Sequence, residues 1–360
     1  MNESKAICCF LPSRSTEKME MAELHAHLNG SLSSRTLHAL RQLQNSSDSE
    51  ASGDSWKKCE AIINHGNERT LDECFQLFSV VHSLTSTPTA VSKATDDVIE
   101  EFEEDGVIYL ELRSTPRCID GVMTKEQYVE AIVKSIRKAN ISRNILTKLI
   151  VSVDRQRGLT EAEENVLLAV DMHSKYPDIV VGIDLSGHPC KGNIEDFLPL
   201  LENARSSGLK LSLHCAEVPN VDEVEKILKF EPHRIGHGTC IHPNFGGSEK
   251  LWNMLSKSGL AVEVCLTSNL KTKTIEGYEK SHLGPLLEQN IPVILSTDDK
   301  GVFATTLSEE CRIAAETFSL TRMWMCEAML QSVSYTFTTE DEKNKLVHSI
   351  HKFMNSSGCS

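Results

Sequence analysis

The chain has 360 residues, and 37 lysines and arginines against 51 aspartates and glutamates give it a net charge of −14. So acidic a protein repels phosphate backbones, which argues against a nucleic-acid binder with a broad basic face. Hydrophobic residues make up 40% and charged residues 24% of the chain, as in folded globular proteins. No apolar run approaches the roughly 20 residues of a membrane span. We therefore expect neither nucleic acid nor membrane as a partner.

The two ends and one internal segment are polar and irregular. We expect a flexible N-terminal segment over residues 1–19, a loop over 45–55 and a C-terminal tail over 351–360. The apolar stretch 6–12 is too short for a signal peptide. The 12 cysteines contain no C-x-x-C pair, so reduced thiols and a cytosolic location are expected.

Eight short aliphatic runs alternate along the chain with longer stretches of helical periodicity. In chain order the predicted strands are Met21–Leu24, Val107–Leu112, Leu146–Val153, Ile179–Leu185, Leu209–Leu213, Arg234–Ile235, Leu260–Leu266 and Ile291–Leu295. The first and sixth runs contain few apolar residues. Two intervening helices have clear boundaries: one begins at Thr87-Pro88 and ends at Gly106, and another follows Thr70 as far as His82.

Eight strands separated by crossover helices predict a parallel sheet, and eight is the number that closes a (β/α)₈ TIM barrel. A doubly wound open sheet is the alternative, although the periodicity favours the barrel. At about 150 residues per domain the length suggests roughly two domains. Because α/β barrels with insertions exceed about 250 residues as one domain, we predict a single TIM-barrel catalytic domain over residues 20–350.

Titratable residues gather at the predicted strand ends. The carboxyl ends of barrel strands meet at one face, where active sites are built. His25 and His27 come directly after the first run, and strand alternation points both to the same side. Further residues of this kind follow the later runs, namely Asp154, Asp184, His214, Glu217, His237, Asp298 and Asp299. Each alone has an ordinary explanation as a core histidine, a helix cap or a turn residue. Their coincidence at strand ends predicts a site.

Three histidines with one carboxylate suit Zn²⁺ with an open position for water. The predicted ligands are His25, His27, His214 and Asp298. Zinc lowers the pKa of bound water to about 7, so His237 could orient or deprotonate that water and Glu217 could act as an acid. One ion is expected, because no lysine ends the fourth run to carry a bridging carbamate. Walker A, dinucleotide-binding, G-x-S-x-G, H-E-x-x-H and cytidine-deaminase signatures are absent.

Five blocks together resemble the adenosine deaminase family of metal-dependent amidohydrolases: Glu23–Gly30, Asp184–Gly187, His214–Glu217, Arg234–Thr239 and Ser296–Asp299. The resemblance implies zinc on the four predicted ligands. It also implies that Glu217 protonates N1 of a purine, His237 assists the water and Asp299 holds the hydroxide and the ring. Gly187 would offer its backbone amide to N3. Attack at C6 then expels the exocyclic amine.

The segment Glu111–Arg117 departs from the nucleoside enzymes of the family. Together with Leu28–Gly30, Thr70–Phe75 and Asp298–Phe303 it is more similar to the adenosine-deaminase-like branch, which removes alkylamines from N6-methyl-AMP. That resemblance implies IMP and methylamine as products. It also implies a set of substrate-binding residues, namely His27, Asn29, His82, Ser114, Thr115, Pro116, Arg117, Asp154, Gly187 and Asp299.

The physical argument for a nucleotide substrate depends on Arg117, since arginine grips phosphate bidentately. The alternative is a surface or helix-capping arginine. For His82 the alternative is a histidine on a helix face, and Arg113 is expected to form a salt bridge inside the barrel. Two other functions stay open: an adenosine or deoxyadenosine deaminase, and a catalytically silent metal-containing binding protein. We expect a monomer with one Zn²⁺ per chain.

Overall fold

The computed structural model describes residues 18–45, 53–66 and 69–356. The predictions for residues 1–17, for most of the 45–55 loop and for residues 357–360 lie outside these ranges. The short stretch 6–12 lies outside them too.

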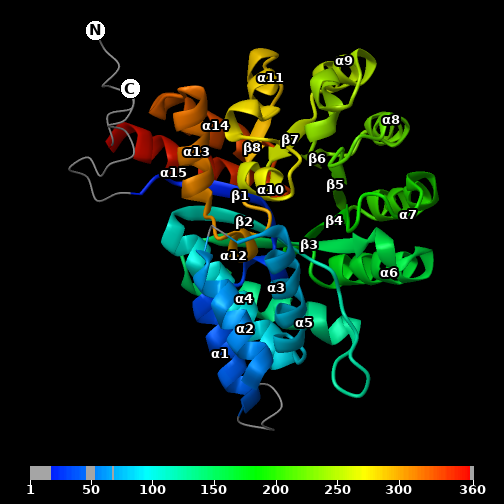
Figure 1. Cartoon of the computed structure of the whole chain (residues 1–360), viewed down its shortest axis with the longest axis vertical. Coiled ribbons are helices and arrows are strands. Elements are labelled where there is room, and N and C mark those ends of the chain that lie inside the picture. Colours follow the sequence, from blue (N-terminus) through cyan, green and yellow to red (C-terminus); the bar gives the residue numbers. More distant parts are fainter. Residues whose placement is uncertain (1–17, 46–52, 67–68, 357–360) are drawn as a thin grey trace.

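Eight parallel strands follow one another around a barrel in chain order (Figure 1). They are β1 (Met21–His27), β2 (Val107–Ser114), β3 (Leu146–Asp154), β4 (Val180–Ser186), β5 (Lys210–Cys215), β6 (Arg234–His237), β7 (Ala261–Val264) and β8 (Val293–Leu295). Each corresponds to a predicted run. The chain just after β8 closes the ring, because Asp298 donates its N–H to His25 O at 2.8 Å and accepts from His27 N at 2.9 Å. The TIM barrel is confirmed, and the open sheet is excluded.

Helices surround the barrel and link successive strands. Those of the outer ring are α4 (Pro88–Asp105), α5 (Lys125–Ser142), α6 (Leu159–Lys175), α7 (Ile194–Ser206), α8 (Val221–Phe230), α9 (Glu249–Ser258), α11 (Leu283–Glu288), α13 (Leu307–Phe318), α14 (Arg322–Ser334) and α15 (Glu340–Ser356). Three more helices, inserted between β1 and β2, pack together beside α4: α1 (Ser34–Asn45), α2 (Gly53–Asn64) and α3 (Leu71–Leu84). The short helices α10 (Leu266–Lys271) and α12 (Lys300–Phe303) follow β7 and β8.

The two marked helix boundaries arise from local capping. The Thr87 side chain accepts from Ala90 N, proline occupies the first turn of α4, and Gly106 ends it at φ 102°. A capping box between Thr70 and Glu73 starts α3. These contacts satisfy backbone groups that a helix end leaves free.

Two predicted boundaries are wrong. The 45–55 loop extends too far, because α2 already begins at Gly53. The tail over 351–360 begins inside α15, which continues to Ser356 and buries Phe353 against the core. In both places a polar composition concealed a helix that packs by one face.

The barrel interior carries charge at its centre. Glu111, Arg113, Arg234 and Glu263 are all fully buried there, and the expected salt bridge of Arg113 is present. Within the described ranges, none of the helices combines the length and apolar composition that a bilayer crossing needs.

Candidate active site and metal centre

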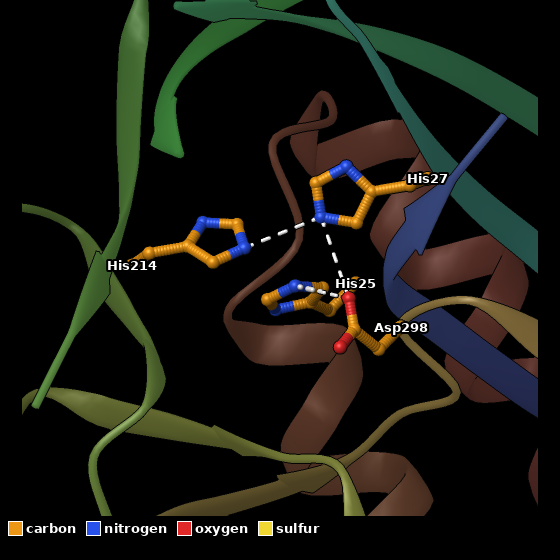
Figure 2. A group of neighbouring side chains, drawn as sticks. All are labelled: His25, His27, His214 and Asp298. Carbon is orange, nitrogen blue, oxygen red and sulfur yellow. Dashed lines mark hydrogen bonds and ion pairs between the residues drawn. The ribbon is translucent and has the colours of Figure 1, made fainter. Parts of the chain in front are cut away.

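Four predicted ligands meet at the carboxyl face of the barrel. The ligand atoms of His25, His27, His214 and Asp298 all lie within 4.8 Å of one another. Nε2 of His27 is 3.2 Å from Nε2 of His214 and 3.4 Å from Oδ1 of Asp298, and dashed lines mark both contacts in Figure 2. The same Oδ1 lies 3.4 Å from Nε2 of His25. Ligands at about 2.0–2.1 Å from a tetrahedral zinc ion are about 3.3 Å apart, so these spacings fit one ion.

Carboxylates fix the orientation of two histidines from behind. Nδ1 of His25 lies 2.8 Å from Oε2 of Glu263, and Nδ1 of His214 lies 2.8 Å from Oδ1 of Asp184. An ionised carboxylate only accepts, so each Nδ1 carries a proton and each Nε2 faces the centre. Nε2 of His25 is buried without a hydrogen-bond partner among the described residues, as expected of a nitrogen that binds a cation.

The protonation of the histidines agrees with a cation site. Burial lowers the pKa of His27 to about 3, although Asp298 acts in the opposite direction. Burial also lowers the pKa of His214, but Asp184 outweighs it and the pKa is raised to about 9. The His214 ring therefore holds a proton that its Nε2 donates toward His27. A metal ion binding between the two nitrogens replaces that proton, and the donor set fits a metal centre.

The backbone is strained where it delivers these side chains. Ala216, His237 and Asp298 have φ angles of 58°, 62° and 60°, a region that non-glycine residues rarely occupy. Each lies just past or at the end of a strand, where the left-handed turn brings its neighbours over the barrel mouth. Strain of this kind concentrates at functional sites.

The two predicted catalytic residues lie beside the metal centre. Oε2 of Glu217 is 3.8 Å from Nε2 of His237, which is 4.0 Å from Oδ2 of Asp298. Burial raises the pKa of Glu217 and lowers the pKa of His237 well below its usual value. The site thus brings together a carboxyl that holds its proton and a neutral imidazole, the groups that general acid–base catalysis uses.

The pKa values of the adjacent carboxyls of Asp298 and Asp299 are shifted in opposite directions. Burial raises the pKa of Asp298, but the surrounding histidines outweigh it and hold it well below its usual value. Burial, together with the charges of Asp298 and Glu217, raises the pKa of Asp299. The Asp299 side chain lies against Gly30, where a β-carbon would stand 1.6 Å from its Oδ1. Gly30 is therefore the residue that leaves room for Asp299.

Several predicted substrate residues meet at Tyr128 on the β2 side. The Tyr128 hydroxyl is 2.8 Å from Ser114 Oγ and accepts from Asn29 Nδ2 at 3.3 Å, while the guanidinium of Arg117 lies over its ring. Oδ1 of Asn29 and Nε of Arg117 are buried without partners among the described residues. Thr115 is half-buried and Pro116 is buried. The orphaned atoms are the ones free for a ligand.

Arg117 also makes the contacts of its helix-capping alternative. It donates to His82 O at 3.1 Å and to Thr85 O at 2.7 Å, both at the end of α3. The alternative interpretation of His82 also holds in part, since it lies in the last turn of α3. Burial lowers the pKa of His82 to about 4, assisted by Arg117 and Arg157.

Asp154 and Gly187 form a second group, on β3 and after β4. A β-carbon on Gly187, whose φ is +93°, would stand 2.0 Å from Oδ1 of Asp154, so only glycine fits. Oδ2 of Asp154 accepts from Arg157 Nε at 3.1 Å. Asp154 also raises the pKa of His82, and we call this group and the Tyr128 group together the opening side of the site.

Three supporting residues escaped the sequence analysis. Glu263 holds His25, Ser268 Oγ donates to Asp298 Oδ2 at 2.7 Å, and Asn269 Nδ2 lies 3.4 Å from His237 Nδ1. Glu263 had a signal, since it is a lone carboxylate in the apolar run Leu260–Leu266. Ser268 and Asn269 had none, because their place depends on the turn from β7 into α10.

Comparisons with known proteins agree with this site. The sequence model described as Adenosine deaminase matches residues 21–353. The chain belongs to the adenosine deaminase family. It is 42% identical over 332 residues to an N6-Methyl-AMP deaminase of Bos taurus, covering 91% of this chain and 93% of the bovine protein. With the N6-Methyl-AMP deaminase of Homo sapiens it shares 41% identity, covering 91% and 92% of the two chains.

A solved structure, arabidopsis ADAL complexed with IMP, superposes with a TM-score of 0.82 at 34% identity, covering 93% of this chain and 96% of that one. Membership of the adenosine deaminase family confirms the predicted resemblance, and it confirms an enzyme that catalyses deamination. The catalytically silent alternative is not supported.

Proposed function

We propose that this protein is a zinc-dependent hydrolase that converts N6-methyl-AMP and related N6-alkyl purine monophosphates, with water, into IMP and the free amine. One observation carries the proposal: four metal ligands, a carboxyl with a raised pKa and a neutral imidazole converge at one barrel face. The relatives named N6-methyl-AMP deaminase support the choice of substrate.

His25, His27, His214 and Asp298 would hold one zinc ion, a borderline metal that imidazole and carboxylate ligands suit. Bound there, zinc supplies a water molecule that ionises near neutral pH. No described cysteine belongs to this ligand group. One chain supplies all four ligands.

The chain's own groups prepare the purine for attack. Glu217, whose pKa burial raises, donates a proton to ring nitrogen N1 and so makes C6 electrophilic. His237, which is neutral, accepts a proton from the attacking water. Asp299 orients the water and the ring. The N–H of Gly187 donates to N3 and fixes the plane of the purine.

The monophosphate lies toward the Tyr128 side of the opening in this proposal. Nε of Arg117 and Oδ1 of Asn29 have no hydrogen-bond partner among the described residues, so one donor and one acceptor remain for the ribose phosphate. His82 and the segment Ser114–Pro116 line the same side, and Asp154 faces them. An arginine is a strong local attraction for phosphate in a chain of net charge −14.

We also propose that the barrel with its helices, which continue through α15 to Ser356, acts as one catalytic domain in a monomer, because a single barrel supplies every ligand and catalytic group. Free thiols among the described residues suit a reducing compartment such as the cytosol, and they belong to Cys59, Cys74, Cys118, Cys190, Cys215, Cys240, Cys265 and Cys311.

A substrate comparison tests the proposal. Purified protein, loaded with zinc or treated with a chelator, is incubated with adenosine, AMP and N6-methyl-AMP while amine release is followed. We expect chelator-sensitive methylamine release from N6-methyl-AMP. Preferred turnover of adenosine would favour the nucleoside deaminase, and no turnover of any purine by zinc-loaded protein would overturn the deaminase.

A further inference from the structure

A row of buried charges crosses the barrel beneath the metal centre. It runs from Glu111 to Arg234, then to Glu263, Arg113 and Asp184, and each neighbouring pair is in contact. All five side chains are fully buried. Such a row is held together only if every charge is paired, since an unpaired buried charge costs several kcal/mol.

Arg113 contacts the two carboxylates of this row that hold metal ligands. Its Nη2 donates to Oε2 of Glu263, the oxygen that also accepts from Nδ1 of His25. Its Nη1 lies 3.5 Å from Oδ1 of Asp184, the oxygen that accepts from Nδ1 of His214. One guanidinium therefore touches the two oxygens that set the orientation of two ligands.

The same guanidinium also fixes the strands that carry those ligands. Nη2 of Arg113 donates at 2.8 Å to the carbonyl of Leu24, the residue directly before His25 in β1. It donates to Ser212 Oγ at 2.9 Å, two residues before His214 in β5. Ser212 in turn donates to Oε1 of Glu263 at 2.7 Å. Arg113 thus reaches backbone and side-chain supports of both histidines.

The side chains of the other two ligands are held by other groups, although the backbone of Arg113 pairs with His27 between β1 and β2. Oδ2 of Asp298 accepts from Ser268 at 2.7 Å. His27 is the most exposed ligand, with 20% of its side chain accessible. Arg234, at the far end of the row, contacts Glu263 through Oε1 and Glu111 but makes no contact with Asp184 among the described residues.

We propose that Arg113 is a positioning residue that couples His25 to His214 and thereby sets the affinity and geometry of the metal centre. The inference rests on the proposed function only in that the four ligands hold an ion. The planar guanidinium holds its donors in a fixed fork that sets the positions of two carboxylates, whereas the lysine ammonium is a point charge on a flexible stem. Outer contacts of this kind typically change metal affinity about 10–100-fold.

The test compares two matched charge-preserving variants, Arg113→Lys and Arg234→Lys. Both alter a fully buried arginine of the same row. Zinc affinity is measured by competition with a chromophoric chelator, and the visible spectrum of the Co²⁺-loaded protein reports ligand geometry. We expect Arg113→Lys to weaken zinc binding about 10–100-fold and to alter the Co²⁺ spectrum. We expect the zinc affinity of Arg234→Lys to stay within about 3-fold of that of the unmodified protein. Its loss of thermal stability should be similar to that of Arg113→Lys. Excess zinc should restore kcat in Arg113→Lys.

A milder pair covers the case in which Arg113→Lys does not fold. Ser212→Ala removes the hydroxyl that joins Arg113 to Glu263, and Ser332→Ala removes a buried hydroxyl in α14 that bonds to Ala328 O. Only Ser212→Ala should weaken zinc binding. Equal zinc affinity within either pair overturns the proposal. An unmodified protein that binds zinc but deaminates no purine overturns the function alone, and one that binds no zinc overturns both.

Discussion

The two sides of the site are built differently. On the metal side, His25 and His214 are held by carboxylates that are themselves fully buried and paired. On the opening side, Arg117 is half-buried and donates to the end of α3, while the buried Asp154 accepts from Arg157. His25 and His214 each have one buried carboxylate partner at Nδ1, which leaves them one role. Arg117 is more accessible, so it can bind the end of α3 and a substrate at the same time. We therefore expect the metal side to determine the chemistry and the opening side to determine the substrate.

Removing the proton donor Glu217 on the metal side should have the largest effect on catalysis. Replacing Glu217 by Gln removes the proton donor while keeping its size, so we expect kcat to fall by about 10²–10⁴-fold with little change in KM. Steady-state kinetics on N6-methyl-AMP measures this. Asp222→Asn, an exposed carboxylate on the neighbouring helix, should leave both constants unchanged. A change in KM alone would assign Glu217 to binding.

The opening side should give a smaller effect that depends on the substrate. Arg117→Gln keeps a donor for the end of α3 but loses the positive charge, so we expect KM for the monophosphate to rise about 10–100-fold. KM for the nucleoside should stay within about 3-fold. As a control, Arg157→Gln, which loses contacts to Asp154 and Glu161, should affect both substrates alike. Equal effects of Arg117→Gln on both substrates would leave Arg117 only its helix-capping role.

The smallest expected effect is on the pH dependence of stability, through Glu310, which binds the start of α10 on the metal side. Glu310 is fully buried and accepts from Thr267 N at 3.1 Å, next to Ser268 that holds Asp298. Burial raises the pKa of Glu310 to about 7. The folded state therefore binds this proton more tightly than the unfolded state, and stability is lost as pH rises from about 4.5 through 7.

Glu310→Gln should remove that loss, since the amide oxygen can still accept from Thr267. The free energy of unfolding, measured between pH 5 and 8, should fall with pH by up to about 3 kcal/mol more in the unmodified protein than in Glu310→Gln. Parallel curves for the two proteins would show that Glu310 does not titrate in this range.

The barrel and its ligands were predictable from sequence for a physical reason. Strand alternation fixes which side His25 and His27 occupy, and parallel strands bring His214 and Asp298 to the same face. Particular partners between distant residues were not predictable, among them Glu263 for His25 and Ser268 for Asp298. Nor were the positive φ angles at Ala216 and His237, because tertiary packing imposes them. The start of α2 at Gly53 was hidden by a polar composition.

A hydrolytic deaminase takes the oxygen at C6 of its product from water, and isotope-labelled water shows this. Zinc-loaded protein is given N6-methyl-AMP in H₂¹⁸O, and the products are followed by mass spectrometry. We expect one methylamine and one IMP with a single ¹⁸O at C6 per turnover, and no reaction after the metal is removed. Unlabelled IMP, or unchanged N6-methyl-AMP in the presence of zinc-loaded protein, would show that this protein is not a hydrolytic deaminase of N6-methyl-AMP.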